Sequence, residues 1–461
     1  MRARAGDPPR TMAEKVLAAR SPGATATSDR IEVAVDQVVL ARTPGRALGS
    51  ARAAGLKKAA VEVAIAYDGH CVTAGADRGL TAAADFLTHG ILVARPGVGF
   101  AAPVHTERFA SPGRFCLTDE PRLAGVGGIG MLTLVAPAAL LARALVQGSA
   151  MIRRPVSVQV LVTGRLRPFV CARDVALELV RRGLGDVVRR VEQARGAPVV
   201  LEFAGASARA LSVGERAVLA DVAPQVGAAA ALFVADERTE VFLRDQRRSK
   251  AHRALAPDTG APSEELVTVD LGAVDPLLRD EGGRVRAVRD LDGQPVTQVL
   301  LGGDGGATLR DLLAVAALLK SKRVPPRLDF LLAVPSRQML EVLASTGALA
   351  DLLATGARLL EPDARAMLGE LYPPPASGVA LRTCAPEPRG PGQRGHVVAS
   401  AETLAYAVAT GEVGDPRAFK RPVRVTVPRA LPTDDVLVTR KAERAAASRS
   451  AEPAAVEALP A

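Results

Sequence analysis

Histidine and cysteine are the residues whose spacing most often marks a metal or nucleophilic site. The chain has five histidines and four cysteines. No two histidines have the i,i+4 spacing of a helical zinc site, and no two cysteines have C-x-x-C spacing. Residue types and spacing therefore predict neither a zinc site nor a cysteine-ligated cluster. The residues are His70, His89, His105, His252 and His396, and Cys71, Cys116, Cys171 and Cys384.

Two short segments could still carry chemistry. Asp68-Gly69-His70-Cys71 follows a predicted strand, but neighbouring side chains on a strand face opposite ways, so we interpret it as a structural loop. Gly302–Gly306, G-G-D-G-G, lies between a predicted strand and a helix, where backbone amides can hold an anion. It lacks the lysine of a phosphate-binding loop, and Asp304 would repel phosphate. We predict a tight turn there.

The elements that must position these residues alternate between strand and helix. This alternation predicts an α/β protein. A capping-box spacing at Thr11 and Glu14 predicts a first helix. Residues 374–396 are rich in proline, glycine and arginine and are predicted to be irregular. The expected strands are 31–41, 61–67, 156–164, 198–205, 296–302, 328–336 and 422–427, and the expected helices are 81–90, 174–185, 214–233, 236–248, 307–322 and 337–356.

Composition and charge bound the remaining classes. The 461 residues carry a net charge of +10, and residues 1–60 alone hold 11 Lys and Arg against 5 Asp and Glu. A basic end on a nearly neutral body indicates a solvated terminus rather than a folded nucleic-acid interface. Residues 124–142 lack charge, but their glycines favour a loop and a buried helix over a membrane span. No signal peptide is seen, so we expect a cytoplasmic protein without a membrane partner.

A family resemblance extends over residues 11–419. The segments that carry it are TMAEKVLAARS (11–21), RDVALELVRRGLG (173–185), LEFAGASARALSVGERAVLADVAPQVGAAAALFVADE (201–237) and AETLAYAVATGEVGDPRAF (401–419). Their order and spacing resemble the 3-isopropylmalate dehydratase large subunit of the aconitase superfamily. The resemblance implies a three-part α/β/α body without a swivel domain. The expected parts are 1–10 as a flexible N-terminus, 11–285 and 286–419 as the two parts of the body, 420–439 as a linker-like segment and 440–461 as a disordered tail.

The resemblance also implies a cofactor in active relatives. These hold a [4Fe-4S] cluster on three cysteines, with one iron open to the substrate hydroxyl and carboxylate. The first cysteine belongs to a G-S-C-T-N loop, where this chain has Asp304, and the other two to a C-G-P-C-L-G turn, where it has Ala364 and Met367. A carboxylate, a methyl group and a thioether cannot replace three thiolates. We therefore predict no cluster, no other cofactor and no metal.

The substrate side of the family site has changed as well. The G-A-D-S-H-T loop corresponds to residues 118–123, and Asp221 and Gln225 stand where relatives carry an asparagine and a glutamate. A glutamine cannot act as a base. The positions of the former pocket are predicted to be Asp68, His70, Glu120, Arg122, Asp221, Gln225 and Arg389.

Three functions follow from the resemblance. The first is a clusterless, non-catalytic homologue that binds or regulates, with a small swivel-type subunit or a catalytic large-subunit paralogue as partner. The alternative is a hydro-lyase acting on a 2-hydroxy diacid such as isopropylmalate, with a divalent ion held by Asp304, Glu120 and His70. The second alternative is an RNA-binding protein that uses the basic ends.

Overall fold

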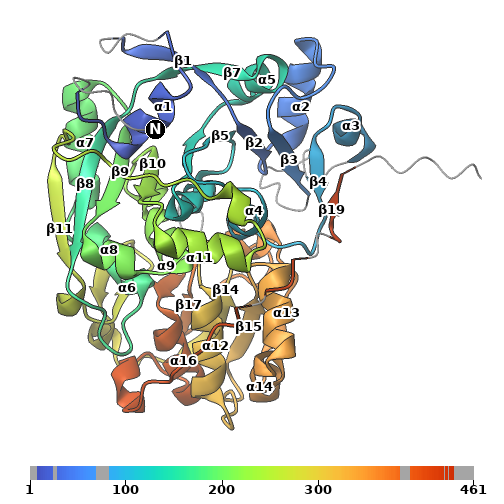
Figure 1. The fold of residues 1–461 in the computed structure, drawn as a ribbon. Coiled ribbons are helices and arrows are strands. Elements are labelled where there is room, and N and C mark those ends of the chain that lie inside the picture. The colour runs from blue at the N-terminus through green and yellow to red at the C-terminus, as the bar shows by residue number, and fades with distance from the viewer. Residues whose placement is uncertain are drawn as a thin grey trace, which may run out of the picture.

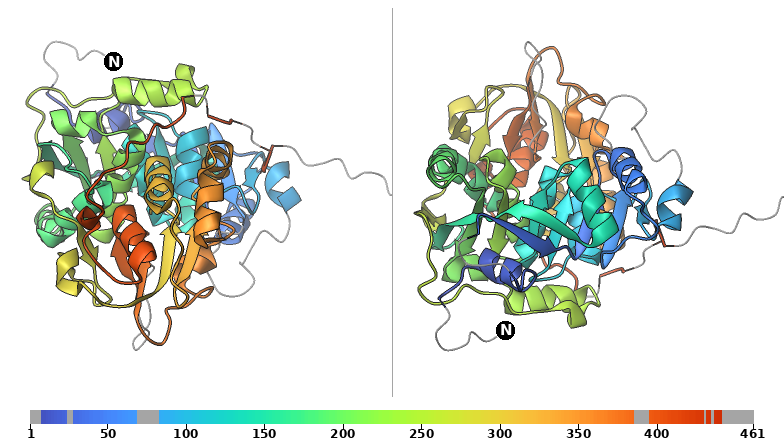
Figure 2. Two further views of the ribbon diagram at one scale, coloured as in Figure 1. Left: turned by 90° about the horizontal axis from the view of Figure 1, so that it is seen from below. Right: turned by 90° about the horizontal axis from the view of Figure 1, so that it is seen from above.

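The computed structural model describes residues 8–23, 28–68, 83–384, 395–429, 431–433 and 436–440, with only the backbone described for Met367 and Leu368. These residues form sheets of six, four and seven strands and a separate two-stranded ribbon. Helices cover the sheets, and the three bodies meet at the centre of the molecule (Figures 1 and 2). The predicted α/β class and aconitase-like three-part body are therefore confirmed.

The first body contains the six-stranded sheet, in the order β19-β4-β3-β2-β5-β6. Its five strands from the N-terminal part of the chain are parallel, so their carboxyl ends meet at one edge. The strands are β2 (Gln37–Leu40), β3 (Val63–Tyr67), β4 (Leu92–Ala94), β5 (Phe115–Thr118) and β6 (Leu132–Val135). The helices are α1 (Met12–Ala18), α2 (Pro44–Ala53), α3 (Ala83–Thr88), α4 (Ala101–Arg108), the 3₁₀ helix η1 (Pro121–Ile129) and α5 (Ala138–Gln147), and the ribbon pairs β1 (Arg30–Ala34) with β7 (Ser149–Arg153).

The second body contains the four-stranded parallel sheet, in the order β10-β9-β8-β11. A core of valine, leucine and alanine lies beneath its helices, with Phe203 stacked on Phe233 at 4.4 Å between ring centroids. The strands are β8 (Val156–Thr163), β9 (Val199–Ala204), β10 (Ala230–Phe233) and β11 (Leu266–Asp270). The helices are α6 (Ala172–Arg181), α7 (Leu184–Arg195), α8 (Ala206–Ala210), α9 (Val213–Ala220), α10 (Val222–Gln225), α11 (Glu237–Asp245), η2 (Ser249–Ala251) and η3 (Leu271–Ala273).

The third body contains the seven-stranded mixed sheet, in the order β13-β12-β18-β17-β14-β15-β16. Its five strands from β18 to β16 are parallel, and β12, next to β18, runs antiparallel to both of its neighbours. The strands are β12 (Leu277–Arg279), β13 (Val285–Ala287), β14 (Val296–Gly302), β15 (Asp329–Ala333), β16 (Arg358–Leu359), β17 (Val379–Arg382) and β18 (Val397–Ala399). The helices are η4 (Val288–Leu291), α12 (Leu309–Leu319), α13 (Arg337–Ser345), α14 (Ala348–Thr355), α15 (Ala364–Leu368), α16 (Ala401–Thr410) and η5 (Pro416–Phe419).

Two long-range connections tie the bodies together. Thr11 and Glu14 form the predicted capping box of α1, and buried Glu202 on β9 accepts hydrogen bonds from the Met12 and Ala13 amides, both at 2.9 Å. The segment after η5 returns across the molecule to β19 (Val438–Thr439), which pairs antiparallel with β4 (Figure 2). The first helix and the last strand that the structure describes are thus each bonded to a strand far away in the sequence.

Several sequence-based expectations for individual elements are wrong. Residues 230–233, predicted as the end of a helix, form β10, because pairing with β9 inside the core overrides the helix preference of an alanine-rich segment. The region 374–396 is not wholly irregular, since β17 lies within it. The predicted strand 31–41 divides into β1 and β2, and 422–427 is not a strand.

The uncharged stretch 124–142 is divided among η1, β6 and the start of α5, rather than forming a loop and one buried helix. Within the described ranges, every helix is too short or too polar to cross a lipid bilayer.

One buried ion pair in the second body provides a test of the packing. Arg216 has no exposed surface, and its guanidinium donates to Asp236 at 2.8 and 3.0 Å and to the Val234 and Arg209 carbonyls, each at 2.9 Å. Removing the arginine would leave Asp236 and two carbonyls without these donors. We expect Arg216→Met to lower the free energy of unfolding, measured by chemical denaturation, by roughly 3–5 kcal/mol.

The matched control is Arg189→Met. Arg189 pairs with Asp186 at 3.1 Å on the surface of α7, where both side chains are mostly exposed. Arg189→Met is expected to lower the free energy of unfolding by less than about 1 kcal/mol. An equally small loss for Arg216→Met would contradict the role given to the buried pair.

Candidate functional site

The candidate site is a buried group of carboxylates at the junction of the three bodies. Glu120 follows β5 of the first body, Asp221 joins α9 to α10 in the second, and Asp304 follows β14 of the third. Their exposed fractions are only 5%, 3% and 4%. The structure therefore brings together three predicted site residues that lie far apart in the sequence.

Arginine side chains hold Glu120 in place. Arg42, which follows the neighbouring strand β2, donates to both Glu120 carboxylate oxygens, at 3.0 and 3.3 Å. The Arg122 amide donates to Glu120 Oε1 at 2.9 Å, at the start of η1. A bidentate guanidinium–carboxylate pair of this kind is rigid as well as attractive.

Asp221 and Gln225 form the second part of the site. Gln225 Nε2 donates to the Asp221 carbonyl oxygen at 3.0 Å and to its carboxylate at 3.3 Å. Arg279 donates to Gln225 Oε1 at 3.3 Å, and Arg173 lies 3.8 Å from the Asp221 carboxylate. Gln225 thus bridges Asp221 and Arg279.

The glycine-rich segment 302–306 forms the turn that carries Asp304, as predicted. Gly302 has φ +102°, and a Cβ there would lie 1.9 Å from the Ala333 carbonyl oxygen. Gly305 has φ +65°, and its Cβ would come within 2.9–3.1 Å of the Asp221 carboxylate. Arg173 donates to the Gly305 carbonyl. The glycines allow the loop of the third body to approach the second body closely.

Burial changes the protonation of this site. It raises the pKa of Asp304 to about 8, with nearby Glu120 and Asp221 adding to the rise and Arg122 opposing it. Burial also raises the pKa of Asp221 to about 6, although Arg173 and Arg122 lower it. Asp304 Oδ1 has no hydrogen-bond partner among the described residues. At neutral pH Asp304 is therefore largely the neutral acid.

The three positions predicted from the resemblance to correspond to cluster ligands do not offer a matching donor set. Ala364 is buried at the first position of α15 and Met367 lies on the same helix, while Asp304 supplies one oxygen. Cys384 lies near the turn, since a Cβ on Gly306 would lie 2.9 Å from the Cys384 Cβ. One thiol cannot hold a four-iron cluster, which needs thiolates at several irons.

The described cysteines do not converge. Cys116 and Cys384 belong to different buried clusters, and Cys171 caps α6. Burial raises the pKa of all three thiols, which keeps them neutral. The residues that the structure describes therefore do not fit a [4Fe-4S] cluster.

Three further positions were predicted for this site: Asp68, His70 and Arg389. Asp68 is half-buried at the end of β3, with its amide donating to the Ala94 carbonyl at 2.8 Å. His70 and Arg389 lie outside the described residues, as does Cys71. Sequence reasoning did not identify Arg42, Arg173 and Arg279. Arg173 lies inside a segment that carries the family resemblance, but its type and spacing alone do not predict a buried partner.

One cavity reaches the edge of the site. It has a volume of about 290 Å³ and includes Arg122 and Gly305 in its wall. The rest of its lining is mainly apolar and comes from α4, α9, α11, α12 and α13 together with residues 427, 428 and 431. Neither Glu120, Asp221 nor Asp304 lines it.

The protonation of Asp304 can be tested through stability. In the unfolded chain an aspartate has a pKa near 3.9, so between about pH 4 and 8 the folded state holds a proton that the unfolded state has lost. This contribution to stability is full below about pH 4 and is lost as the pH rises to about 8. We expect Asp304→Asn to become progressively more stable relative to the wild type over that interval, by up to about 1.4 kcal/mol per pH unit.

Urea denaturation at a series of pH values would measure the difference. The control is Asp186→Asn, which changes an exposed carboxyl group on α7 and should leave the slope unchanged. A constant difference between Asp304→Asn and the wild type would rule out the raised pKa.

Comparisons with known proteins agree with this geometry. Residues 79–279 match the model of the aconitase family (aconitate hydratase). The chain is 29% identical to 3-isopropylmalate dehydratase large subunit 1 of Deinococcus radiodurans over 78% of this chain and 82% of that protein. It is 27% identical to 3-isopropylmalate dehydratase large subunit 2 of Archaeoglobus fulgidus, over 70% and 77% of the two chains. It is 31% identical to the homoaconitase large subunit of Thermus thermophilus, over 61% and 65%. The chain is therefore similar to the aconitase family over residues 79–279 and to the large subunits of 3-isopropylmalate dehydratase over most of its length.

Proposed function

We propose that this protein is a non-catalytic large-subunit homologue, which lacks the iron–sulfur cluster and acts by binding a partner chain. The observation that carries the proposal is the donor set at Asp304, Ala364 and Met367, which offers no thiolate. Without a cluster, the electrophile that active relatives use on a substrate hydroxyl is missing.

The ion pairs around the former site support the same proposal. Glu120 is engaged by Arg42 and the Arg122 amide, and Asp221 lies beside Arg173 and Gln225. An incoming diacid would have to take these arginines from carboxylates that are already buried. Leaving such a carboxylate buried and unpaired costs several kcal/mol. The network therefore favours a closed junction over an open substrate site.

The 290 Å³ cavity is the surface that we assign to a partner. Its rim carries the partly exposed apolar side chains of Val241 and Val427, and its floor reaches Arg122 and Gly305. Apolar surface of this kind next to a charged centre is typical of a protein interface. The proposed partner is a small swivel-type subunit, since the relatives are named large subunits; a catalytic large-subunit paralogue is the other candidate.

A second candidate function is hydro-lyase activity on a 2-hydroxy diacid. It is favoured by the relatives, which are named dehydratases and a homoaconitase, and by the Asp304 oxygen that lacks a hydrogen-bond partner among the described residues. A divalent ion at Asp304 would supply Lewis acidity, and oxygen ligands suit Mg²⁺ or Mn²⁺. The RNA-binding alternative stays a prediction from charge.

Anaerobic iron–sulfur reconstitution tests the proposed loss of the cluster. The wild-type chain is expected to remain colourless with well under one iron per chain. The triple variant Asp304→Cys/Ala364→Cys/Met367→Cys is expected to gain the visible absorption of a cluster with about four irons. Both are compared in a Cys171→Ser background, so that iron held near Cys171 is not counted.

About four irons in the wild-type chain would overturn the proposal. A colourless triple variant that keeps its fold, measured by circular dichroism, would refute the correspondence of these three positions with the family ligands. Isopropylmalate dehydration that requires Mn²⁺ and disappears in Asp304→Ala would replace the proposal with the hydro-lyase candidate.

The partner surface has its own prediction. With the purified small subunit from the same genome, Val241→Glu is expected to weaken binding at least about tenfold, because it places a charge in an apolar contact. The control is Leu266→Glu on β11, an exposed apolar residue that does not line the cavity. Equal binding of both variants and the wild type by calorimetry would exclude this surface.

A further inference from the structure

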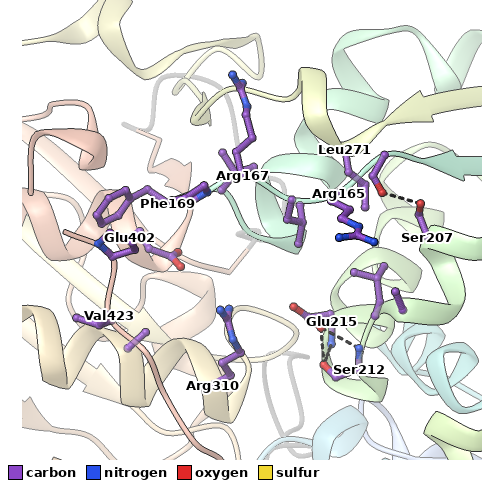
Figure 3. A pocket seen from close by; sticks show the side chains of 18 of the residues that line it. Arg165, Arg167, Phe169, Ser207, Ser212, Glu215, Leu271, Arg310, Glu402 and Val423 are labelled. Atoms are coloured by element: carbon purple, nitrogen blue, oxygen red, sulfur yellow. Dashed lines mark hydrogen bonds between the residues drawn. The ribbon is translucent and has the colours of Figure 1, made fainter. Parts of the chain in front are cut away.

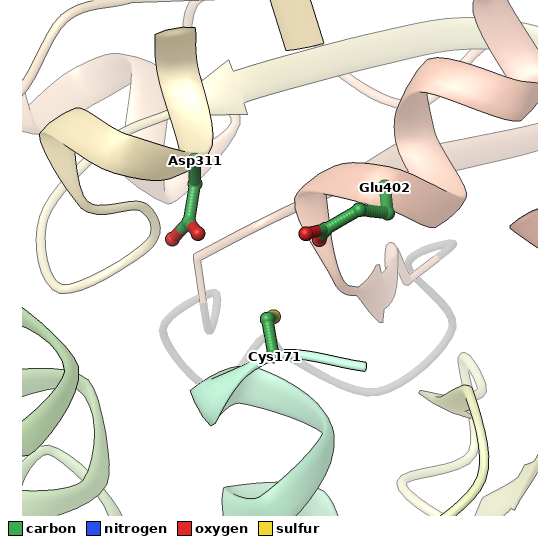
Figure 4. Close-up of side chains that lie close together, drawn as sticks. All are labelled: Cys171, Asp311 and Glu402. Carbon is green, nitrogen blue, oxygen red and sulfur yellow. The ribbon is translucent and has the colours of Figure 1, made fainter. Parts of the chain in front are cut away.

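A second group of titratable side chains lies apart from the Asp304 site, where the first turns of three helices meet. Cys171 is the N-cap of α6, Asp311 is the third residue of α12, and Glu402 is the second residue of α16. One ligand atom from each of the three lies within 4.8 Å of the others (Figure 4). Thiolate and carboxylate are both metal-ligating groups.

Local hydrogen bonds fix two of these side chains. Asp311 accepts from the Thr308 amide at 2.9 Å, while Thr308 Oγ1 accepts from the Asp311 amide, which completes a capping box. The Cys171 amide donates to Asp174 at 3.0 Å, and Asp174 also accepts from the Leu277 amide at 2.9 Å. Such partners orient ligands in the way that surrounding hydrogen bonds do in metal sites.

Glu402 supplies the independent observation. The exposed fraction of Glu402 is only 7%, and its Oε2 has no hydrogen-bond partner among the described residues. Figure 4 shows its carboxylate directed toward Asp311 and Cys171. A buried carboxylate oxygen without a donor is costly unless a proton or a cation meets it.

The titratable groups that face one another here are mostly acidic: the Cys171 thiol and the carboxyls of Asp311 and Glu402, with the Asp174 carboxyl bonded to the Cys171 amide. Arg310 is the cation whose charge acts on both Asp311 and Glu402. The positive ends of three helix dipoles favour the ionised form of these side chains, which is the form that ligates a metal.

We propose that Cys171, Asp311 and Glu402 bind one divalent cation of the zinc class. One sulfur and two oxygen ligands suit Zn²⁺, which takes three protein ligands and a water in open sites. Ligand atoms on one tetrahedral zinc are roughly 3.2–3.8 Å apart, given bonds of about 2.0 and 2.3 Å. The present separations therefore need to shorten by at most about 1–1.5 Å, which side-chain rotation can supply.

A cavity gives the ion access. It has a volume of about 540 Å³ and lies between α8 and α9 of the second body and α12 and α16 of the third. Glu402 forms part of its wall, close to Phe169 and across from Arg165 and Arg310 (Figure 3). Glu402 thus connects the cavity to the buried thiol, so an ion can reach the group without passing the Asp304 site.

Metal binding by the full-length chain tests the proposal. After treatment with a chelator and equilibration with micromolar Zn²⁺, the wild type is expected to hold about one zinc per chain by mass spectrometry. Binding should release protons, since the thiol and carboxyls must ionise. Co²⁺ in place of zinc should give a thiolate-to-cobalt charge-transfer band in the near ultraviolet.

Two variants and one control make the test specific. Cys171→Ser and Glu402→Gln are each expected to weaken zinc binding at least about 100-fold, and Cys171→Ser should remove the cobalt band. Cys116→Ser, at another buried thiol, should change neither. Melting curves establish that each variant folds. A wild type without zinc, or zinc binding that survives both substitutions, would overturn the proposal and leave a proton shared between Asp311 and Glu402.

Discussion

The constraint on which the rest of the structure depends is the pairing of buried carboxylates with arginines at the junction of three sheets. Glu120, Asp221 and Asp304 come from three separate bodies, and each is at least nine-tenths buried. A carboxylate in such a place must be paired or protonated, because the ionised group alone is too costly to bury. Glu120 is paired with Arg42, and Asp221 lies beside Arg173. Asp304 has a raised pKa, which favours its protonated form. The junction can therefore bury three carboxyl groups without leaving an ionised one unpaired.

The fold and the cluster chemistry depend on different residues. The apolar cores of the three bodies and the glycine turn at 302–306 need no cofactor to form. A cluster, in contrast, depends on three sulfur atoms at one place, and those positions can change without disturbing a sheet. Fold and activity can thus part within one family, and function has to be argued from the site. The proposed zinc group at α6, α12 and α16 is built differently, because two of its ligands, Cys171 and Asp311, also belong to the caps of the helices that carry them.

Much of the fold could be predicted from the sequence, and the reasons are local. The capping box at Thr11 and Glu14 and the strand predicted over 61–67 depend on neighbouring residues; the capping box is confirmed, and the strand forms as β3 over 63–67. The helix predicted over 230–233 was wrong, because burial beside β9 decides that segment. Of the site, Glu120, Asp221, Gln225 and Asp304 were identified through family resemblance, and they do lie together. Arg42 and Arg279 could not be identified, since only tertiary contacts place them there. The group of Cys171, Asp311 and Glu402 was missed for the same reason: its members are 140 and 91 residues apart in sequence.

The pairing of β19 with β4 has a consequence for the synthesis of the protein on the ribosome. β4 is the outermost parallel strand of the first sheet, and the strand that covers its edge comes from residues 438 and 439. At a translation rate of about 5–20 residues per second, that strand is made roughly 20–70 s after β4. During this time the nascent sheet keeps an open hydrogen-bonding edge, the kind that invites association between neighbouring chains on a polysome. Residues near the end of the described chain thus close the sheet that is synthesised first.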